Sequence, residues 1–339
     1  MKTSDFDYNL PERFIAQSPV SPRDHSKLLV FKTDTGEILH RHFFDLPDYI
    51  GENHVLVTNR SKVIPARIIF KEDGSEREIF ILKNNGHHIY HVMVRPGRAF
   101  KNGRSFSISK NEIGTVIDVH TDGTRMVQFN SDIEKFGETP VPPYIKNHNV
   151  PANKYQTVYA KEKGSVAAPT AGLHFTKRLL SKLEGGGVSI EEVILHVGRG
   201  TFLPVTAEKI EDHVMHGEFF VFPESCAKRL NRAKSVGNKI VAVGTTSVRV
   251  LESRFKSGKG FVPGSGETDI FIYPGYHWNA VDALVTNFHL PKSTLIMLVA
   301  SLLQNKGVKN PIEKILEIYE IAKKNKYRFY SFGDAMLII

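Results

Sequence analysis

The segment Lys239–Arg249, which reads Lys-Ile-Val-Ala-Val-Gly-Thr-Thr-Ser-Val-Arg, indicates the class of fold. Its apolar run Lys239–Val243 predicts a buried strand, and a helix is expected to follow from Ser247. Further predicted elements alternate around this unit: strands at Val188–Val197, Ile270–Tyr273 and Ala283–Thr286, and helices at Glu224–Ala233, Ser293–Leu303 and Ile312–Lys324. Such alternation predicts a mixed α/β domain with a largely parallel or mixed sheet.

The residues from about Pro65 to Asn149 show a different sequence pattern. Short β-rich runs alternate with turn dipeptides such as Asn85-Gly86 and Asp122-Gly123, and no stretch of helical period interrupts them. This pattern predicts a small antiparallel β-barrel inserted in the larger domain. We therefore expect a large α/β domain formed by residues 1–62 and 150–339, and an inserted β-barrel domain at residues 63–149.

Composition and charge narrow the class of protein. The chain has 339 residues, a formal net charge of +9 and one cysteine, Cys226. A lone cysteine excludes an internal disulfide framework and cysteine-rich metal sites. The N-terminus has no apolar segment of the kind found in signal peptides, and no apolar run approaches the roughly 20 residues of a membrane span. We expect a soluble, cytoplasmic protein without a membrane partner. The basic charge is compatible with a nucleic-acid partner but does not demonstrate one.

A small, nearly uncharged loop at Ser165–Thr176 contains Thr170 and His174 and leads into a predicted helix. Thr176 is a good N-cap, leucines follow at helical spacing, and Gly185–Gly187 ends the helix. A loop of small residues that opens a helix offers free backbone N–H groups and the positive end of the helix dipole. His174 is therefore either a ligand contact or a structural residue in a tight turn.

Polar residues recur at the ends of several predicted strands. Two examples are Thr286–His289 and Gly244–Arg249, and the hydroxyls and N–H groups of the second suit a carboxylate or a phosphate. The cluster His196–Phe202 begins like a dinucleotide-binding fingerprint, but Leu203 occupies the third glycine position, which argues against an ordinary Rossmann cofactor site. Together with Asn59 and the loop described above, these clusters predict one shared crevice at the carboxyl ends of the strands.

Two groups of histidines could suggest a metal ion. His213 and His216 have a His-x-x-His spacing and precede Glu218, but they lack the glutamate of His-Glu-x-x-His and a completing cluster of ligands. His87 and His88 are adjacent on a predicted strand, so they point to opposite faces and cannot easily share one ion. We expect no metal site.

Two groups of cations could bind the phosphates of RNA. Five cations and no acid lie between Arg95 and Lys110 in the predicted barrel, where a solvated edge is the alternative. Within Lys323–Asp334 four cations alternate with four aromatic residues, which suits a phosphodiester with unstacked bases. The alternative there is a helix end followed by an aromatic strand in the core. The two interpretations are compatible if the cations point outward to RNA and some of the aromatic rings point into the core.

Several stretches spread over the chain match one known pattern. They are Phe6–Pro11 with Arg23 and Asp24, Ser165–Thr176, His196–Val205, His213–Glu218, Val243–Glu252, Glu267–Tyr276, Val281–Val299 and Tyr327–Ile338. Together they span nearly the whole chain and resemble the S-adenosylmethionine:tRNA ribosyltransferase-isomerases of queuosine biosynthesis. Lys27 stands where arginine is expected and Trp278 where phenylalanine is expected, which puts local contacts there in doubt. The resemblance implies a mixed α/β domain that carries an inserted β-barrel.

The resemblance also implies that the protein is an enzyme, a transferase that isomerises the group it transfers. The family moves the ribosyl part of S-adenosylmethionine to the 7-aminomethyl-7-deazaguanine base in the tRNA anticodon, which gives epoxyqueuosine-tRNA and releases adenine and methionine. S-adenosylmethionine is then consumed as a co-substrate, no cofactor is needed, and the partner is a tRNA with the modified base. The oligomeric state stays open.

This implied chemistry assigns roles to residues. A base must take a proton from the 5′ carbon beside the sulfonium, and an acid must protonate the departing adenine. As base or acid we choose His174 first, then His216 and His289, with Glu267 and Asp269 as possible acids. As substrate-binding residues we expect Asn59, Thr170, Arg199, Thr201, Thr245, Thr246, Ser247, Arg249, Tyr273 and Asn287. Of these, Thr245, Thr246, Ser247 and Arg249 are assigned to the methionyl end or to a phosphate. As tRNA-binding residues we expect Arg95, Arg98, Lys101, Arg104, Lys324, Lys326 and Arg328.

Two alternatives come from other classes of function. A metal-dependent hydrolase of nucleic acids would use His213, His216 and Glu218. A tRNA-binding module without catalysis would use only the basic barrel and the C-terminal stretch. The loop Ser165–Thr176 and the clusters at strand ends favour the transferase, because a pure binding module has no reason to carry them.

Overall fold

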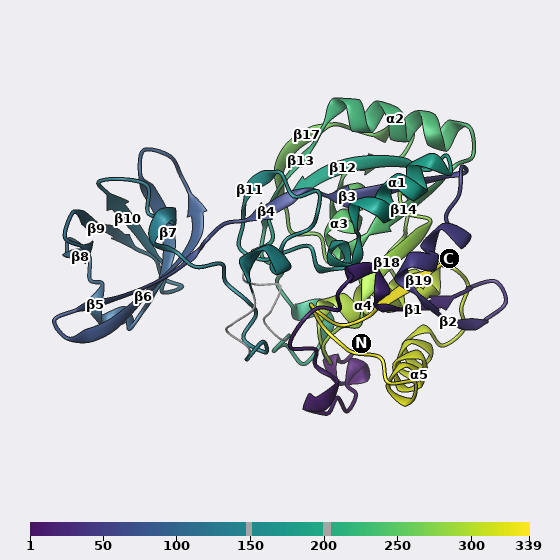
Figure 1. Cartoon of the computed structure of the whole chain (residues 1–339), viewed down its shortest axis with the longest axis horizontal. Coiled ribbons are helices and arrows are strands. Elements are labelled where there is room, and N and C mark those ends of the chain that lie inside the picture. The colour runs from purple at the N-terminus through teal and green to yellow at the C-terminus, as the bar shows by residue number, and fades with distance from the viewer. Residues whose placement is uncertain (147–150, 199–204) are drawn as a thin grey trace.

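The computed structural model describes residues 1–146, 151–198 and 205–339. Figure 1 shows two parts: a larger α/β part, and a smaller group of strands, β5–β10, that lies to one side of it. The chain enters and leaves the smaller part beside a short parallel pair, β4 (Ser61–Val63) and β11 (Glu162–Ser165). This arrangement confirms the mixed α/β fold with an inserted antiparallel barrel.

A nine-stranded mixed sheet forms the centre of the larger part. Its strand order is β17-β13-β12-β3-β14-β18-β19-β1-β2. The four strands in the middle run parallel: β12 (Ser189–Leu195), β3 (His54–Asn59), β14 (Lys239–Val243) and β18 (Ala283–Asn287). The outer strands are β13 (Glu218–Phe222) and β17 (Gly264–Thr268) on one side, and β19 (Ala335–Ile338), β1 (Lys27–Phe31) and β2 (Ile38–His42) on the other.

Helices cover both faces of this sheet, and the alternation of side chains along β3 shows it. Val55 and Val57 pack with helices α2 to α5, whereas Leu56 packs on the opposite face with α1 and the 3-10 helix η4. The helices on the first face are α2 (Glu224–Ser235), α3 (Gly244–Arg254), α4 (Thr294–Asn305) and α5 (Pro311–Lys324). Those on the second are η4 (Phe43–Asp48) and α1 (Lys177–Gly185).

Short elements complete the larger part. A two-stranded hairpin is formed by β15 (Phe255–Lys256) and β16 (Gly260–Phe261). Further 3-10 helices in the chain are η1 (Thr3–Phe6), η2 (Glu12–Phe14), η3 (Arg23–His25), η5 (Gly97–Ala99), η6 (Glu134–Phe136), η7 (Ala152–Tyr155), η8 (Thr170–His174) and η10 (Ile210–Asp212). None of the helices in the described part of the chain is both long and apolar enough to cross a membrane.

The helix after the Ser165 loop begins as predicted. The hydroxyl of Thr176 accepts a hydrogen bond of 3.1 Å from the backbone N–H of Leu179, which makes Thr176 the N-cap of α1. Gly187 follows the helix with a φ of +85°, a left-handed conformation that glycine adopts without strain.

Two predicted elements differ from the structure. Ile270–Tyr273 is not a strand; the strand is β17 just before it, which pairs with β13. Because β17 is a largely exposed edge strand with the sequence Gly-Ser-Gly-Glu-Thr, it has no apolar signal, whereas Ile272 packs in the core from an irregular segment. Helix α3 begins at Gly244, not at Ser247, because Gly244 turns the chain directly out of β14 with a φ of +82°.

The smaller part is a six-stranded antiparallel sheet that curls into a nearly closed barrel. Its strand order is β5-β6-β7-β10-β9-β8, with bounds Arg67–Glu72, Ser75–Asn84, Ile89–Arg95, Arg125–Phe129, Glu112–Val119 and Ser105–Ser109 in that order. The edge strands β5 and β8 meet: the ring of Phe70 stacks on that of Phe106 at 5.8 Å. Beside them Arg104 pairs with Glu72 at 2.7 Å. These contacts close the barrel.

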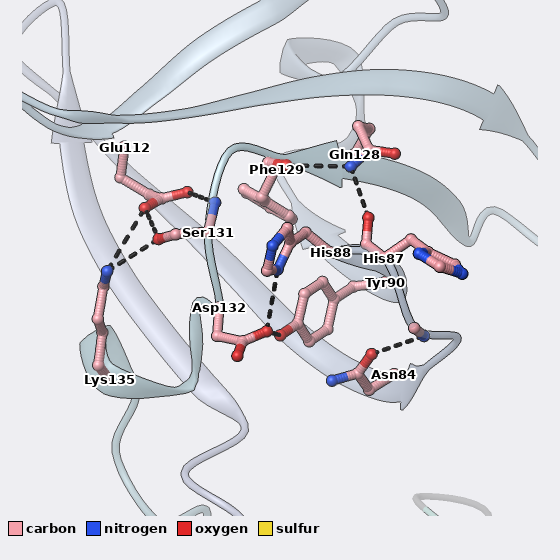
Figure 2. A network of polar contacts seen from close by, with 11 residues as sticks. Asn84, His87, His88, Tyr90, Glu112, Gln128, Phe129, Ser131, Asp132 and Lys135 are labelled. Carbon is pink, nitrogen blue, oxygen red and sulfur yellow. Dashed lines mark hydrogen bonds and ion pairs between the residues drawn. The ribbon is translucent and has the colours of Figure 1, made fainter.

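A polar network holds the chain where it leaves the last barrel strand, β10 (Figure 2). The buried carboxylate of Glu112 accepts hydrogen bonds from the backbone N–H and the hydroxyl of Ser131. The Asp132 carboxylate accepts from Tyr90 at 2.9 Å and pairs with His88 at 3.1 Å. Asp132 thus gives His88 a partner within the barrel.

The closure of the barrel gives a prediction for Arg104. Arg104→Met removes the charged hydrogen bond to Glu72, so β8 should open more easily from β5. Hydrogen exchange of β8 amides should speed up by roughly 5–30-fold, since 1–2 kcal/mol corresponds to that factor. Lys101→Met, a change at an exposed neighbouring cation, is the control. Unchanged exchange in the Arg104 variant would show that the ion pair does not hold the barrel closed.

Candidate active site

The parallel pairing of β14 with β18 brings two polar loops to the same edge of the sheet. Val243, the last residue of β14, lies opposite Val285, so Gly244 leaves the sheet beside Thr286 and Asn287, the last residues of β18. Helix η8 crosses the same edge. The pocket between them is lined by apolar residues and by these polar ones: Thr170, Thr245, Thr246, Thr286, Asn287, His289, Ser293 and Ser331. The structure therefore brings Thr170, Thr245, Thr246, Asn287 and His289 of the predicted site together.

The first turn of α3 forms one wall of the pocket. Gly244 lies beside Ala171 of η8: a Cβ atom at Gly244 would be 3.4 Å from that of Ala171, an ordinary contact. Thr245 and Thr246 occupy the first turn, where backbone N–H groups have no partner within the helix. Val243, the residue before the helix, has no polar side chain with which to cap them. The positive end of the α3 dipole therefore faces the pocket and suits an anionic group.

Asn287 connects the pocket to residues behind it. Its side-chain Nδ2 donates to the backbone carbonyl of Tyr330 at 3.2 Å and contacts Nε2 of His174 at 3.1 Å. Its Oδ1 is buried and has no hydrogen-bond partner among the residues that the structure describes. The same holds for Oγ1 of Thr246, which also lines the pocket. Two residues of the pocket wall thus each carry a buried polar atom without a partner among the described residues.

His174 lies behind the pocket wall, not in it. Its ring stacks on that of Phe43 at 5.0 Å, and its Nδ1 lies 2.7 Å from the hydroxyl of buried Ser26. Burial, helped by the nearby charges of Arg328 and Arg23, lowers the pKa of His174 to about 3. The imidazole is therefore neutral at physiological pH, and both ring nitrogens already have partners. It reaches the pocket only through Asn287.

His289 is the predicted histidine that lines the pocket. Its Nε2 lies 2.8 Å from the hydroxyl of Thr286, and burial lowers its pKa to about 3. Two tyrosines hold its backbone: Tyr8 donates to the carbonyl, and the backbone N–H donates to the hydroxyl of Tyr319 at 3.1 Å. The result is a neutral imidazole on a firmly held backbone.

Two predicted contacts, Asn59 and Ser247, are buried and occupied elsewhere. Asn59 donates to the carbonyl of Leu195 at 2.9 Å and accepts from the backbone N–H of Leu195 at 3.1 Å, so it joins β3 to β12. Ser247 donates to the carbonyl of Val243 one helical turn earlier, at 2.8 Å. Neither residue lines the pocket, because each side chain satisfies backbone groups inside the fold.

Arg249 also faces away from the pocket. It forms a buried ion pair with Glu218 and donates to the carbonyl of Thr268 at 3.0 Å, which ties α3 to β13 and β17. Glu218 in turn accepts from the backbone N–H of Gly198 at 2.8 Å. Since Glu218 holds Arg249, it is not free for the metal site of the hydrolase alternative. Among the described residues no three His, Cys, Asp or Glu side chains are close enough to hold a metal ion.

The remaining predicted residues lie outside the pocket or outside the described part of the chain. His216, Glu267 and Asp269 are exposed, and Glu267 lies 3.7 Å from Lys83 of the barrel. Tyr273 packs on Phe271 with a ring distance of 4.8 Å. Arg199 and Thr201 fall in residues 199–204, which are not described.

The predicted tRNA-binding cations differ in their surroundings. Arg95, Arg98 and Lys101 are exposed on the barrel, and Lys324 and Lys326 are exposed at the end of α5. The side chain of Arg104 pairs with Glu72, and that of Arg328 with Asp334 at 3.3 Å. The four aromatic residues of the C-terminal stretch are buried: Tyr327, Phe329, Tyr330 and Phe332. The stretch therefore packs its aromatic rings in the core, as the alternative interpretation expects, and they do not form an exposed stacking surface.

Several residues at this site were not assigned a role from the sequence. Tyr144, Tyr330 and Ser331 line the pocket, and Ser26 contacts His174. Tyr330 and Ser26 fall in or beside stretches that carried the resemblance. Nothing in the local pattern says that these distant segments meet; only the tertiary fold brings them together.

Comparison with known proteins agrees with this geometry. The chain matches the model of a family described as "Queuosine biosynthesis protein" over residues 3–338. Proteins named S-adenosylmethionine:tRNA ribosyltransferase-isomerase from Carboxydothermus hydrogenoformans and Acetivibrio thermocellus are 46% and 48% identical, with 100% of both chains covered in each case. The crystal structure of a Thermotoga maritima S-adenosylmethionine tRNA ribosyltransferase is 37% identical with a TM-score of 0.57, covering 99% of this chain and 100% of that one. The chain therefore belongs to the queuosine biosynthesis protein family.

Proposed function

We propose that the protein transfers the ribosyl moiety of S-adenosylmethionine to the 7-aminomethyl-7-deazaguanine base of a tRNA anticodon and isomerises it. The products are epoxyqueuosine-tRNA, adenine and methionine. S-adenosylmethionine is consumed as a co-substrate and no cofactor takes part. The observation that carries the proposal is the pocket at the ends of β14 and β18, in a chain whose relatives are named for this reaction.

The composition of the pocket supports a sulfonium substrate. None of its described lining residues is charged, so no lysine or arginine there would repel a sulfonium cation. Two tyrosines that line it, Tyr144 and Tyr330, lie with ring centroids 4.7 Å apart, and aromatic faces attract cations. The first turn of α3 supplies the N–H groups that suit the methionyl carboxylate.

His289 is the best-placed candidate for proton transfer. It lines the pocket and is neutral, but a pKa of about 3 makes it a weak base in the free protein, so the proposal requires that bound substrate raise this pKa. His216, Glu267 and Asp269 lie outside the pocket, and His174 already uses both ring nitrogens behind Asn287. The geometry therefore favours His289 as the base.

The exposed cations of the barrel support a tRNA partner. Arg95, Arg98 and Lys101 lie around the end of β7 and the turn that follows, where a phosphate backbone could reach them. The binding-module alternative explains these cations but leaves the uncharged pocket without a purpose.

The reaction can be tested directly. Incubated with S-adenosylmethionine and tRNA bearing the 7-aminomethyl base, the protein should release adenine and methionine in equal amounts and leave a heavier tRNA nucleoside, measured by mass spectrometry. Release of S-adenosylhomocysteine would mean methyl transfer and would refute the proposal. A chelator-sensitive cleavage of the tRNA would instead support the hydrolase.

The role of His289 can be tested by substitution. His289→Gln should lower kcat by about 10²–10⁴-fold, the usual range for loss of a general acid or base, and leave S-adenosylmethionine affinity within a few-fold. His277→Gln, at an exposed histidine, is the control. Since His289 is buried, thermal melting must show that the variant is folded. Near-normal kcat in a folded variant would remove His289 from proton transfer.

The tRNA interface can be tested by salt dependence. Changing Arg95, Arg98 and Lys101 together to Gln should raise the KM for tRNA and flatten the log–log salt slope by roughly 0.7–0.9 for each lost phosphate contact. Arg104 stays unchanged because it pairs with Glu72. A triple variant at the exposed residues Lys182, Lys256 and Lys259 removes the same charge elsewhere. Equal slopes for the two triple variants would exclude the barrel cations and favour the C-terminal ones.

A further inference from the structure

The orientation of the Asn287 side chain is determined by one neighbour. The backbone carbonyl of Tyr330 can only accept a hydrogen bond, and the nearer end of the Asn287 amide lies 3.2 Å from it. That end must therefore be the NH₂ group. The carbonyl end, Oδ1, is then the end left without a partner among the described residues.

The orientation of the Asn287 amide also determines which ring nitrogen of His174 carries the proton. Nε2 of His174 faces the NH₂ group of Asn287 at 3.1 Å, so Nε2 must accept and carries no proton. The neutral ring then has its proton on Nδ1, which donates to the hydroxyl of Ser26 at 2.7 Å. If the proton moved to Nε2, the ring would face the NH₂ group with a second donor and would push the amide out of this orientation. His174 and Ser26 thus keep the Asn287 side-chain amide in this single orientation.

The missing hydrogen bond at Oδ1 of Asn287 lowers the stability of the free protein, and a ligand that donates a hydrogen bond there would remove this penalty. Asn287 is 3% exposed, and a buried acceptor without a partner is unfavourable. Thr246 lines the same pocket, and its hydroxyl is likewise buried and unpaired among the described residues. Because the other walls include Pro169, Phe288 and Leu290, the pocket suits a flat, largely apolar ring that carries an N–H donor.

We infer that Asn287 accepts a hydrogen bond from the amino group of a purine-type ring, and that His174 is the positioning residue that keeps Oδ1 available for it. The inference rests on the proposed function, which supplies two rings of this class: the adenine of S-adenosylmethionine and the guanine-type base of the tRNA. In either case the specificity comes from an acceptor that has no other partner among residues 1–146, 151–198 and 205–339.

The first experiment changes the ligand. Binding of S-adenosylmethionine is compared with binding of an analogue in which hydrogen replaces the 6-amino group, by equilibrium titration of the full chain. If adenine is the ring, the analogue should bind about 10-fold more weakly, and Asn287→Ala should bind both ligands alike. Asn305→Ala, at an exposed asparagine, should discriminate as the unchanged protein does.

A second arm distinguishes the tRNA base. This arm applies if S-adenosylmethionine and its analogue bind with the same affinity. The KM of the normal substrate tRNA is then compared with the KM of a tRNA whose target base lacks its 2-amino group. A rise of about 10-fold that disappears in Asn287→Ala assigns the contact to the base. No discrimination in either arm, in a protein that still releases adenine and methionine, overturns the inference. Failure of the unchanged protein to release them would overturn the proposed function instead.

The positioning role of His174 has its own readout. The side-chain carbonyl of a glutamine can accept from Asn287 where Nε2 now does, and a phenylalanine cannot. His174→Gln should therefore keep the discrimination between ligands, and His174→Phe should lose it. In an Asn287→Ala background His174→Phe should cost no further affinity, because the residue acts through Asn287. A fall in kcat of more than about 100-fold in His174→Gln with discrimination intact would make His174 a proton carrier and overturn the positioning role.

Discussion

The parallel pairing of β14 with β18 is the constraint on which the site depends. Parallel strands end at the same edge of a sheet, so one register, Val243 opposite Val285, places the start of α3 beside Asn287 and His289. The C-terminal segment then returns as β19 against β18, which brings Tyr330 and Ser331 to the same edge. No single loop builds the pocket; the sheet assembles it from segments far apart in the sequence.

Much of the architecture was predictable because its signals are local. The alternation of strands and helices, the turn dipeptides of the barrel and the N-cap at Thr176 each depend on a few neighbouring residues. The edge strand β17 was not predicted, because its five residues contain no apolar side chain and therefore show no hydrophobic periodicity. The expectation of a crevice at strand ends rested on topology, and the pocket at the ends of β14 and β18 agrees with it.

The roles of individual site residues were less predictable, because a polar side chain at the end of a strand has two possible partners. Asn59 and Arg249 lie near strand ends but satisfy groups within the fold, whereas Asn287 has an atom with no partner in the part of the chain that the structure describes. Sequence pattern cannot distinguish these cases, since the difference lies in which distant backbone groups come within 3 Å. Burial adds a second effect that no motif reveals: by lowering their pKa values it keeps His174 and His289 neutral and makes each a weak proton acceptor.

The return strand β11 also forms part of the pocket by continuity of the chain. β11 ends at Ser165, and only two residues separate it from Ala168, which lines the pocket. The hydroxyl of Ser165 donates to the carbonyl of Ala167 and accepts from Val197, another lining residue, so the joint is stiff. A short, hydrogen-bonded segment of chain therefore joins β11, beside the barrel, to the wall of the pocket.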